Sequence, residues 1–261
     1  MTGTQGTMSL SLEAFHIVVS GWIILGLILI PVQLSLTAPF GRHFSTKWGP
    51  VMDNRAGWVI MEIVSPIALW GSFFLSGAAW SSPVVLLLGV WTAHYLNRSV
   101  VYPMRMRTHG KQIPIFIVTS AIVFNSFNGW SNGTYFGAGW GGYSSAWLAD
   151  PRFIVGLMIM ACGAMINLRA DNTLLRLRSS TDRGYAIPRG GMFEKVSCPN
   201  FFGEIVEWIG FAIACWNLPA LAFAIWTTAN LVPRALSHHR FYHRTFEDYP
   251  KNRRALIPGV L

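Results

Sequence analysis

The sequence predicts an all-α integral membrane protein, a bundle of seven transmembrane helices with the N-terminus outside and the C-terminus in the cytoplasm. Of the 261 residues, 52% are apolar and only 12% are charged, which is about half the charged share of an average soluble domain. Seven apolar stretches of 15 to 23 residues cover most of the chain, and basic residues are concentrated in alternate segments between them. These three observations together favour a bilayer as the solvent.

The predicted spans follow one another along the whole chain. Several are short for a hydrocarbon core of about 30 Å, so we expect their polar ends to extend them. The last two spans are divided at Asn217, because Pro219 disfavours a helical conformation in the residue before it. In order, the spans are Ala14–Leu36, Gly57–Ser76, Val84–Tyr102, Ile113–Trp130, Phe153–Leu168, Phe201–Trp216 and Leu218–Val232.

The positions of lysine and arginine predict the orientation. Eighteen of the 20 basic residues follow the first, third, fifth or seventh span, whereas only Arg152 lies in an opposite segment and Arg98 lies within the third span. Cytoplasmic segments of membrane proteins collect such residues. Topology and anionic lipid therefore account for the formal charge of +9. Nucleic acid is not an expected partner, because the charges are divided among membrane loops and no recognised nucleic-acid module accompanies them.

Two further features concern processing and cysteine chemistry. No basic residue precedes the first span, so we expect that span to be retained rather than removed as a secretory signal. The three cysteines have no metal-like spacing, and two of them lie inside apolar stretches, so neither a zinc site nor a disulfide framework is expected. They are Cys162, Cys198 and Cys215.

The second and third spans contain ionisable residues, which are costly at membrane depth and therefore candidates for function. Glu62 is either a hydrogen-bonded structural acid or a carboxyl group that keeps its proton near neutral pH and donates it. In the third span, His94 and Tyr95 lie four and three residues before Arg98, so they neighbour it on one side of a helix. Tyr95 is either a satisfied core residue or a donor to a substrate carbonyl.

The fifth and sixth spans carry polar stripes. Asn167 and Asp171 share one stripe with Arg178 if the fifth helix continues into the cytoplasm. This run is either a solvated basic helix end or a polar face for an anionic ligand. Glu204 and Glu207 share one face of the sixth span, and we expect both to meet a wet cavity with basic partners from the C-terminal segment.

A glycine-rich nucleotide motif is not supported. Gly137, Gly139 and Gly142 match G-x-G-x-x-G, but they lie in an external loop without the strand and helix that such a motif requires.

Several segments resemble the steroid 5α-reductase family. They are "NLRADNTLLRLR" at 167–178, "GYAIPRGGMFEKVSCPNFFGEIVEWIGFAIACWNLPALAFA" at 184–224 and "HHRFYHRTFEDYPKNRRALIP" at 238–258, with "MEIVSP", "HYLNRSVVYP" and "FNGW" upstream. The resemblance implies a single domain over residues 1–261, with a catalytic and cofactor block at about 113–261. We expect a bacterial member of the family, placed in the inner membrane; a eukaryotic member would lie in the endoplasmic reticulum.

The resemblance also implies an activity and a site. The activity is the NADPH-dependent reduction of the double bond of a 3-oxo-Δ4 steroid, without metal or flavin. Glu62 and Tyr95 match the pair that holds the 3-keto group, where hydrogen-bond donors stabilise the charge that develops on oxygen. The positions that match NADPH-binding residues are Asn167, Asp171, Arg178, Asn200, Glu204, Arg234, His238, Tyr242, Arg253 and, in the loop after the third span, Lys111.

Two alternatives remain open at the level of the sequence. One is a related reductase acting on another enone, a polyprenol or an enoyl-CoA. The other is a seven-span transporter that uses the intramembrane carboxylates for ion coupling, although no internal symmetry between two halves is visible. The expected partners are a steroid or steroid-like lipid and the membrane lipid around a monomer.

Overall fold

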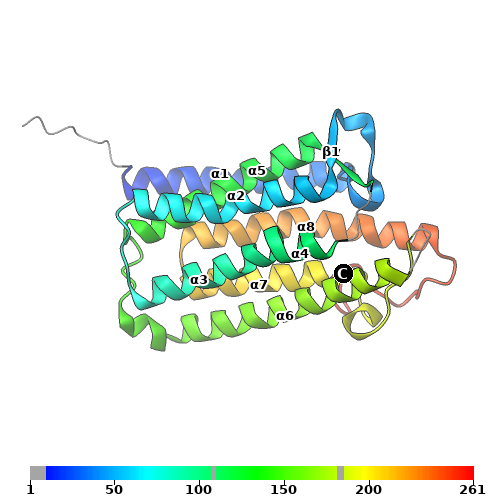
Figure 1. Cartoon of the computed structure of the whole chain (residues 1–261). Coiled ribbons are helices and arrows are strands. Elements are labelled where there is room, and N and C mark those ends of the chain that lie inside the picture. The colour runs from blue at the N-terminus through cyan, green and yellow to red at the C-terminus, as the bar shows by residue number, and fades with distance from the viewer. Residues whose placement is uncertain (1–9, 107–109, 181–184) are drawn as a thin grey trace, which may run out of the picture.

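The fold is a bundle of long helices that run side by side, with β1 and the C-terminus at the same end (Figure 1). The structure is a computed structural model that describes residues 10–106, 110–180 and 185–261. Each predicted span overlaps one long helix, so the prediction of a predominantly helical chain is confirmed. These helices are α1 (Leu12–Ser35), α2 (Asn54–Leu75), α3 (Ser82–Leu96), α5 (Ile115–Gly137), α6 (Pro151–Ser180), α7 (Pro199–Cys215) and α8 (Leu218–Thr245).

Four helical segments of the described chain are long and apolar enough to cross a membrane on their own: Leu12–Ser35, Asn54–Leu75, Ser82–Arg105 and Pro151–Leu177. Of the other three long helices, α7 has only 17 residues, whereas α5 and α8 contain more polar residues. α5, for example, buries the amides of Asn125, Asn128 and Asn132 inside the bundle. These three amides therefore face protein rather than the surroundings.

The third span contains a π-helical segment that the sequence did not reveal. α3 continues without a break into η3 (Asn97–Val101), a π-helix, and then into α4 (Tyr102–Arg105). π-Helical turns add a residue to the turn and are frequent at functional sites. Arg98 lies in this segment, just after Tyr95 of α3, and Tyr95 is buried.

Close packing of α6 against α7 depends on glycine. A Cβ atom on Gly163 would overlap the backbone nitrogen of Glu207, and one on Gly203 would overlap the backbone nitrogen of Asn167. Small residues of this kind allow two membrane helices to approach closely. The approach brings Asn167 of α6 into contact with the first turns of α7.

The turn between α7 and α8 lies where the sequence predicts it. Trp216 has a left-handed conformation with φ of 48°, and the side chain of Asn217 accepts a hydrogen bond from the N–H of Ala220 at 2.9 Å. This is an N-terminal cap of α8. The side-chain amide of Asn217 also donates to the hydroxyl of Tyr143 at 2.8 Å, which ties the turn to the loop before α6.

Several connections were not predicted. A two-stranded antiparallel sheet, β1 (Val51–Asp53) and β2 (Gln112–Pro114), joins the segments before α2 and α5, so α5 begins after the predicted Ile113. The C-terminal segment pairs with the segment before α7 through a parallel bridge between Val196 and Arg254. Short 3-10 turns complete the connections: η1 (Gly41–His43), η2 (Thr46–Trp48), η4 (Ser145–Ala149) and η5 (Gly191–Glu194).

Candidate active site

Arg98 links an acid of α2 to an acid of α6. One terminal nitrogen of its guanidinium lies 3.8 Å from Oε1 of Glu62, and the other donates to Oδ2 of Asp171 at 3.3 Å. The guanidinium also lies over the rings of Trp58 and Tyr102, at 5.0 and 5.1 Å from their centroids. The side chains of Arg98 and Glu62 are only 11% and 14% exposed, so the pair is largely withdrawn from solvent.

Tyr95 is held by an asparagine from another helix. Its hydroxyl donates to Oδ1 of Asn125 at 3.0 Å, and the amide nitrogen of Asn125 donates to the carbonyl of Met61 at 2.6 Å. Since Met61 precedes Glu62, the amide of α5 connects the tyrosine of α3 with the part of α2 that carries the acid. Asn125 was not among the predicted site residues; a buried amide in an apolar span is the signal that could have identified it.

α6 and α7 bring a second polar group together. The amide nitrogen of Asn167 donates to the carbonyl of Asn200 at 3.0 Å and to Oε2 of Glu204 at 3.5 Å. Asn167 and Asp171 are both buried, and they lie one turn apart on α6. α6 extends to Ser180, so the expected continuation of this helix beyond the fifth span is confirmed.

Glu207 has a different partner from the one predicted. We expected Glu204 and Glu207 to share a wet cavity with bases from the C-terminal segment, but Oε1 of Glu207 lies 2.8 Å from Nδ1 of His94 on α3. Both side chains are buried, with 7% and 4% exposed. Glu207 lies almost one turn further along α7 than Glu204. At this level of the bundle the basic partner comes from α3, because His94 lies beside it. The expectation was wrong for Glu207.

The predicted cofactor residues of α8 form a cluster. It lies at the end of the bundle that the sequence predicts to be cytoplasmic. The guanidinium of Arg234 lies over the rings of Phe40 and Phe201, at 4.4 and 5.0 Å. The ring of His238 packs against Phe201 at 5.4 Å. Tyr242 is buried, and the charge of Glu204 acts on Arg234, so this cluster adjoins the polar group between α6 and α7.

Arg253 is engaged in a contact between two segments of the chain. Its guanidinium, which is fully buried, donates to the carbonyl of Pro188 at 2.9 Å and to Oε2 of Glu194 at 3.1 Å. The backbone N–H of Gly190, together with Arg253, holds the pKa of Glu194 below its usual value. Arg253 therefore fastens the C-terminal segment to the segment before α7.

The remaining predicted cofactor residues are Lys111 and Arg178. Lys111 is exposed, and its carbonyl accepts from the N–H of Asn54 at 3.0 Å beside β2. Arg178 belongs to the last turns of α6, but its side chain lies outside the described part of the structure.

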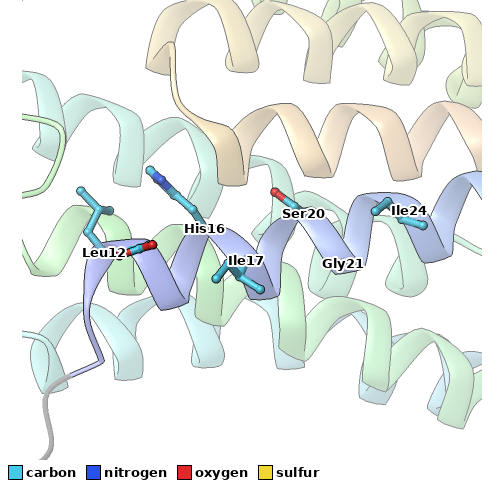
Figure 2. A pocket seen from close by; sticks show the side chains of 7 residues that line it. Leu12, His16, Ile17, Ser20, Gly21 and Ile24 are labelled. Atoms are coloured by element: carbon cyan, nitrogen blue, oxygen red, sulfur yellow. The ribbon is translucent and has the colours of Figure 1, made fainter.

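An open groove of about 860 Å³ runs along α1. Its lining is mostly apolar, unlike the polar groups described above. Figure 2 shows its lining residues, all of which belong to α1. Ile17 and Ile24 of this lining are 67% and 56% exposed, so the groove is part of the outer apolar face of a candidate membrane span.

The geometry defines a class of protein. Long apolar helices enclose carboxylates, amides and an arginine that lie in contact, and ionisable groups placed in this way indicate chemistry within a membrane. Next to the acid–arginine–acid chain lies a tyrosine whose hydroxyl is held by a buried amide. This is the construction of a helical membrane enzyme with a polar site enclosed by apolar helices.

Comparison with known proteins identifies the family. Residues 111–261 match the family described as 3-oxo-5-alpha-steroid 4-dehydrogenase. The chain is 42% identical to 3-oxo-5-alpha-steroid 4-dehydrogenase 1 of Macaca fascicularis over 84% of its own length and 83% of the relative's. It is 40% identical to the human protein of the same name, over 84% and 85% of the two lengths. It is also 40% identical to steroid 5-alpha-reductase DET2 of Gossypium hirsutum, over 90% and 93%.

The chain belongs to the 3-oxo-5-alpha-steroid 4-dehydrogenase family, so the resemblance seen in the sequence is confirmed. These relatives come from animals and a plant, and they give no support to the expected bacterial source.

Proposed function

We propose that this protein uses NADPH to reduce the C4–C5 double bond of a 3-oxo-Δ4 steroid to the 5α-reduced ketone. One observation carries the proposal: in a member of this family, Arg98 joins Glu62 to Asp171 beside the Tyr95 hydroxyl. Contacts through Arg98 therefore join a residue predicted to bind the ketone to a residue predicted to bind the cofactor.

Tyr95 and Glu62 act on the ketone in this proposal. The Tyr95 hydroxyl turns from Asn125 toward the 3-keto oxygen, and the protonated carboxyl of Glu62 donates to the same oxygen. Both donors draw electron density from the conjugated double bond toward oxygen, so C5 becomes electron-poor and accepts a hydride. The hydride forms the new C5–H bond, the π pair of C4–C5 shifts to C3–C4, and the π pair of the carbonyl moves to oxygen, which gives the enol or enolate. C4 then takes a proton from water, and the ketone is restored. The net addition is one hydride and one proton.

The cofactor is bound by the polar residues of α6, α7 and α8. When bound, reduced nicotinamide supplies the hydride. The donor set fits such a molecule: the amide of Asn167 and the carboxylates of Asp171 and Glu204 suit hydroxyl groups and a carboxamide, while Arg234 suits a phosphate. Arg234 has no ion-pair partner within 4.0 Å among the described residues, which leaves its charge for a ligand.

The proposed topology follows from the same assignment. All seven long helices cross the membrane as one domain, with the N-terminus outside and the C-terminal segment in the cytoplasm, where the cofactor is dissolved. A monomer contains every residue named above. The steroid enters from the bilayer, while the charged dinucleotide enters from the cytoplasm.

The test is an assay of the purified full chain in nanodiscs with NADPH and testosterone or progesterone. We expect consumption of NADPH and a steroid product that is two mass units heavier, and neither change should occur without both reactants. Binding of NADPH without any product would move the substrate to another enone. Absence of NADPH binding would contradict the proposal and return the transporter to consideration.

A further inference from the structure

One buried acid–base pair has no part in the reaction proposed above. Nδ1 of His94 lies 2.8 Å from Oε1 of Glu207, and the two side chains are only 7% and 4% exposed. The pair joins α3 to α7 in the interior of a bundle that is proposed to cross the membrane. Ionisable groups are costly at such a place and are usually kept there for a function.

Packing of α3 against α7 does not require this pair. The ring of Trp91 on α3 lies 5.1 Å from that of Trp208 and 5.3 Å from that of Phe211 on α7, between centroids, and all three rings are buried. A buried ion pair adds little net stability, because the cost of desolvating both charges offsets their attraction. Aromatic contacts therefore account for the packing, and the two ionisable side chains need another explanation.

His94 adjoins the site proposed for the ketone. It directly precedes Tyr95, and the centroids of the two rings lie 5.2 Å apart in an edge-to-face arrangement. Trp208 contacts both residues, with its ring 4.7 Å from that of His94 and 6.2 Å from that of Tyr95. A ketone that is bound to the Tyr95 hydroxyl therefore lies in the same part of the bundle as this imidazole.

Charges of the candidate site reach the imidazole as well. The charges of Glu204 and Arg98 act on His94, and the charge of His94 acts on Glu62. A proton on His94 thus influences the acid that is proposed to hold the ketone. The pair of α3 and α7 is electrostatically part of the site, although the sequence and the proposed reaction gave it no role there.

The second nitrogen of the imidazole is accessible. No described residue hydrogen-bonds to Nε2 of His94, and this atom is not among the fully enclosed unpaired nitrogens and oxygens of the described chain. A water molecule can therefore reach Nε2. The carboxylate of Glu207 fixes which end of the ring exchanges protons, because it holds the hydrogen on Nδ1 and leaves Nε2 to gain or lose one.

The proposed reaction needs a proton at a second place. Glu62 and Tyr95 donate to the 3-keto oxygen, whereas the enol or enolate that follows hydride transfer takes its proton at C4. If water alone supplied this proton, hydroxide would form inside an apolar bundle, where an isolated charge is costly. An acid beside that water removes this cost, because it replaces the proton as the water gives it up.

We propose that His94, held by Glu207, is the acid that drives the protonation of C4 through one water molecule. The π pair of C3–C4 forms the new C4–H bond with a proton of the water, while the oxygen of the water takes a proton from Nε2. The carbonyl re-forms at C3, and the hydrogen of an enol returns to Glu62. His94 is then neutral and regains a proton from solvent before the next turnover. This inference rests on the proposed reduction of a 3-oxo-Δ4 steroid.

The experiment compares His94→Gln with His16→Gln in the full chain in nanodiscs. Glutamine can still hydrogen-bond to Glu207, but it does not transfer a proton near neutral pH. His16 belongs to α1, a candidate membrane span, and lines the open groove of that helix (Figure 2), so it is the matched control. Testosterone is reduced with NADPH in D2O, and mass analysis and NMR locate the deuterium at C4. Product kept in D2O without protein corrects for spontaneous exchange beside the ketone.

The face of the ring that receives deuterium is the decisive readout. In the wild type and in His16→Gln we expect one deuterium on a single face of C4. We expect His94→Gln to lower kcat about 100-fold and to place deuterium on both faces, because no residue then orients the water. The Kd for NADPH, measured by nicotinamide fluorescence, should stay within about twofold. A damaged fold would lower the rate but leave the remaining active molecules specific for one face.

Glu207→Gln is the second variant and keeps a hydrogen-bond partner for His94 without the negative charge. We expect kcat to fall about tenfold, which is the scale of one charge-assisted hydrogen bond. Deuterium should remain on one face of C4, because the imidazole is still in place. If His94→Gln does not fold, this variant carries the test, and an unchanged kcat would exclude the pair from the reaction.

Other results would overturn the inference alone. If His94→Gln keeps its deuterium on one face, whether or not kcat falls, the pair serves packing and the water at C4 is oriented by other groups. Such a result leaves the proposed function intact, since the wild type still forms the reduced steroid. A wild-type chain that forms no reduced steroid from testosterone and NADPH would overturn the proposed function and this inference together.

Discussion

A substitution at Glu62 can separate the effect of losing the carboxyl proton from the effect of losing a side-chain contact. Its carboxyl lies 3.8 Å from Arg98, and glutamine has nearly the same shape but cannot release a proton. We predict that Glu62→Gln lowers kcat by about 100-fold or more, the usual scale for a group that transfers or stabilises a proton, and leaves the Kd for NADPH within about twofold. Single-turnover kinetics with pre-bound NADPH measure the first quantity and a binding titration the second. Unchanged turnover would remove Glu62 from the mechanism.

Asn125 is proposed as a positioning residue that acts through Tyr95. Its replacement by alanine removes the acceptor of the Tyr95 hydroxyl and the donor to Met61, and a buried hydroxyl without a partner costs about 1–3 kcal/mol. We predict that Asn125→Ala lowers kcat for the steroid about tenfold with little change in the KM for NADPH. Asn125→Asp keeps an acceptor oxygen at the same place and should recover part of kcat. Equal losses in both variants would point to a general packing defect.

The sequence could reveal which polar residues of the site lie at membrane depth. Charged or amide side chains in apolar stretches, such as Glu62 and Arg98, are conspicuous against their neighbours. The contacts among them were not visible, because Arg98 meets Asp171 across 73 positions of sequence. The partner of Glu207 was wrongly predicted for the same reason.

Pairs of helices, rather than single helices, set the geometry of the site. α6 and α7 approach closely enough for Asn167 to reach the carbonyl of Asn200, and this approach requires glycine at Gly163. Gly163→Ala would place a methyl group on the backbone of Glu207, and overpacking costs about 1–3 kcal/mol. We predict a Tm lower by about 3 °C or more and a weaker affinity for NADPH.

Gly71→Ala is the matched control for that prediction. Gly71 also lies inside a long helix, α2, but its added methyl group would meet nothing within 4 Å. Its Tm should stay the same or rise slightly, because alanine favours helix over glycine. If both variants lose the same stability, close approach of α6 and α7 is not the cause.

Most helix positions were predictable, and their ends were not. Apolar runs of membrane length mark helices, and proline at Pro219 marks the turn before α8. An apolar run, however, does not show where its helix ends outside the membrane. The last predicted span ends at Val232, and its helix α8 continues to Thr245. The polar continuation packs against the C-terminal segment through Tyr242 and Tyr249, whose rings are stacked at 5.1 Å.

At the scale of the whole molecule, the C-terminal segment packs over the end of the bundle that is proposed to bind the cofactor. The N–H groups of Ser197 and Cys198 donate to the carbonyls of Arg254 and Ala255 at 2.8 and 3.1 Å. Arg253 is buried beneath these contacts and reaches Glu194. A residue predicted to bind the cofactor thus holds together two distant segments that border the cluster of α8. Its loss would affect cofactor binding through this closure even without a direct contact.

The Glu194–Arg253 contact predicts a dependence of stability on pH. The N–H of Gly190 and the charge of Arg253 hold the pKa of Glu194 below its ordinary value of 4.5, so its ionised form is favoured in the folded chain. The stabilising contribution is therefore fully present above pH 4.5 and is lost as the pH falls through the lower, folded-state pKa. Glu194→Gln cannot titrate. We predict that its Tm in nanodiscs lies below that of the wild type at pH 7 and that the two values converge once the pH falls below the folded-state pKa of Glu194. A constant difference across this range would mean that the charge of Glu194 does not support the closure, and that packing of Tyr249 and the backbone bridge hold the segment alone.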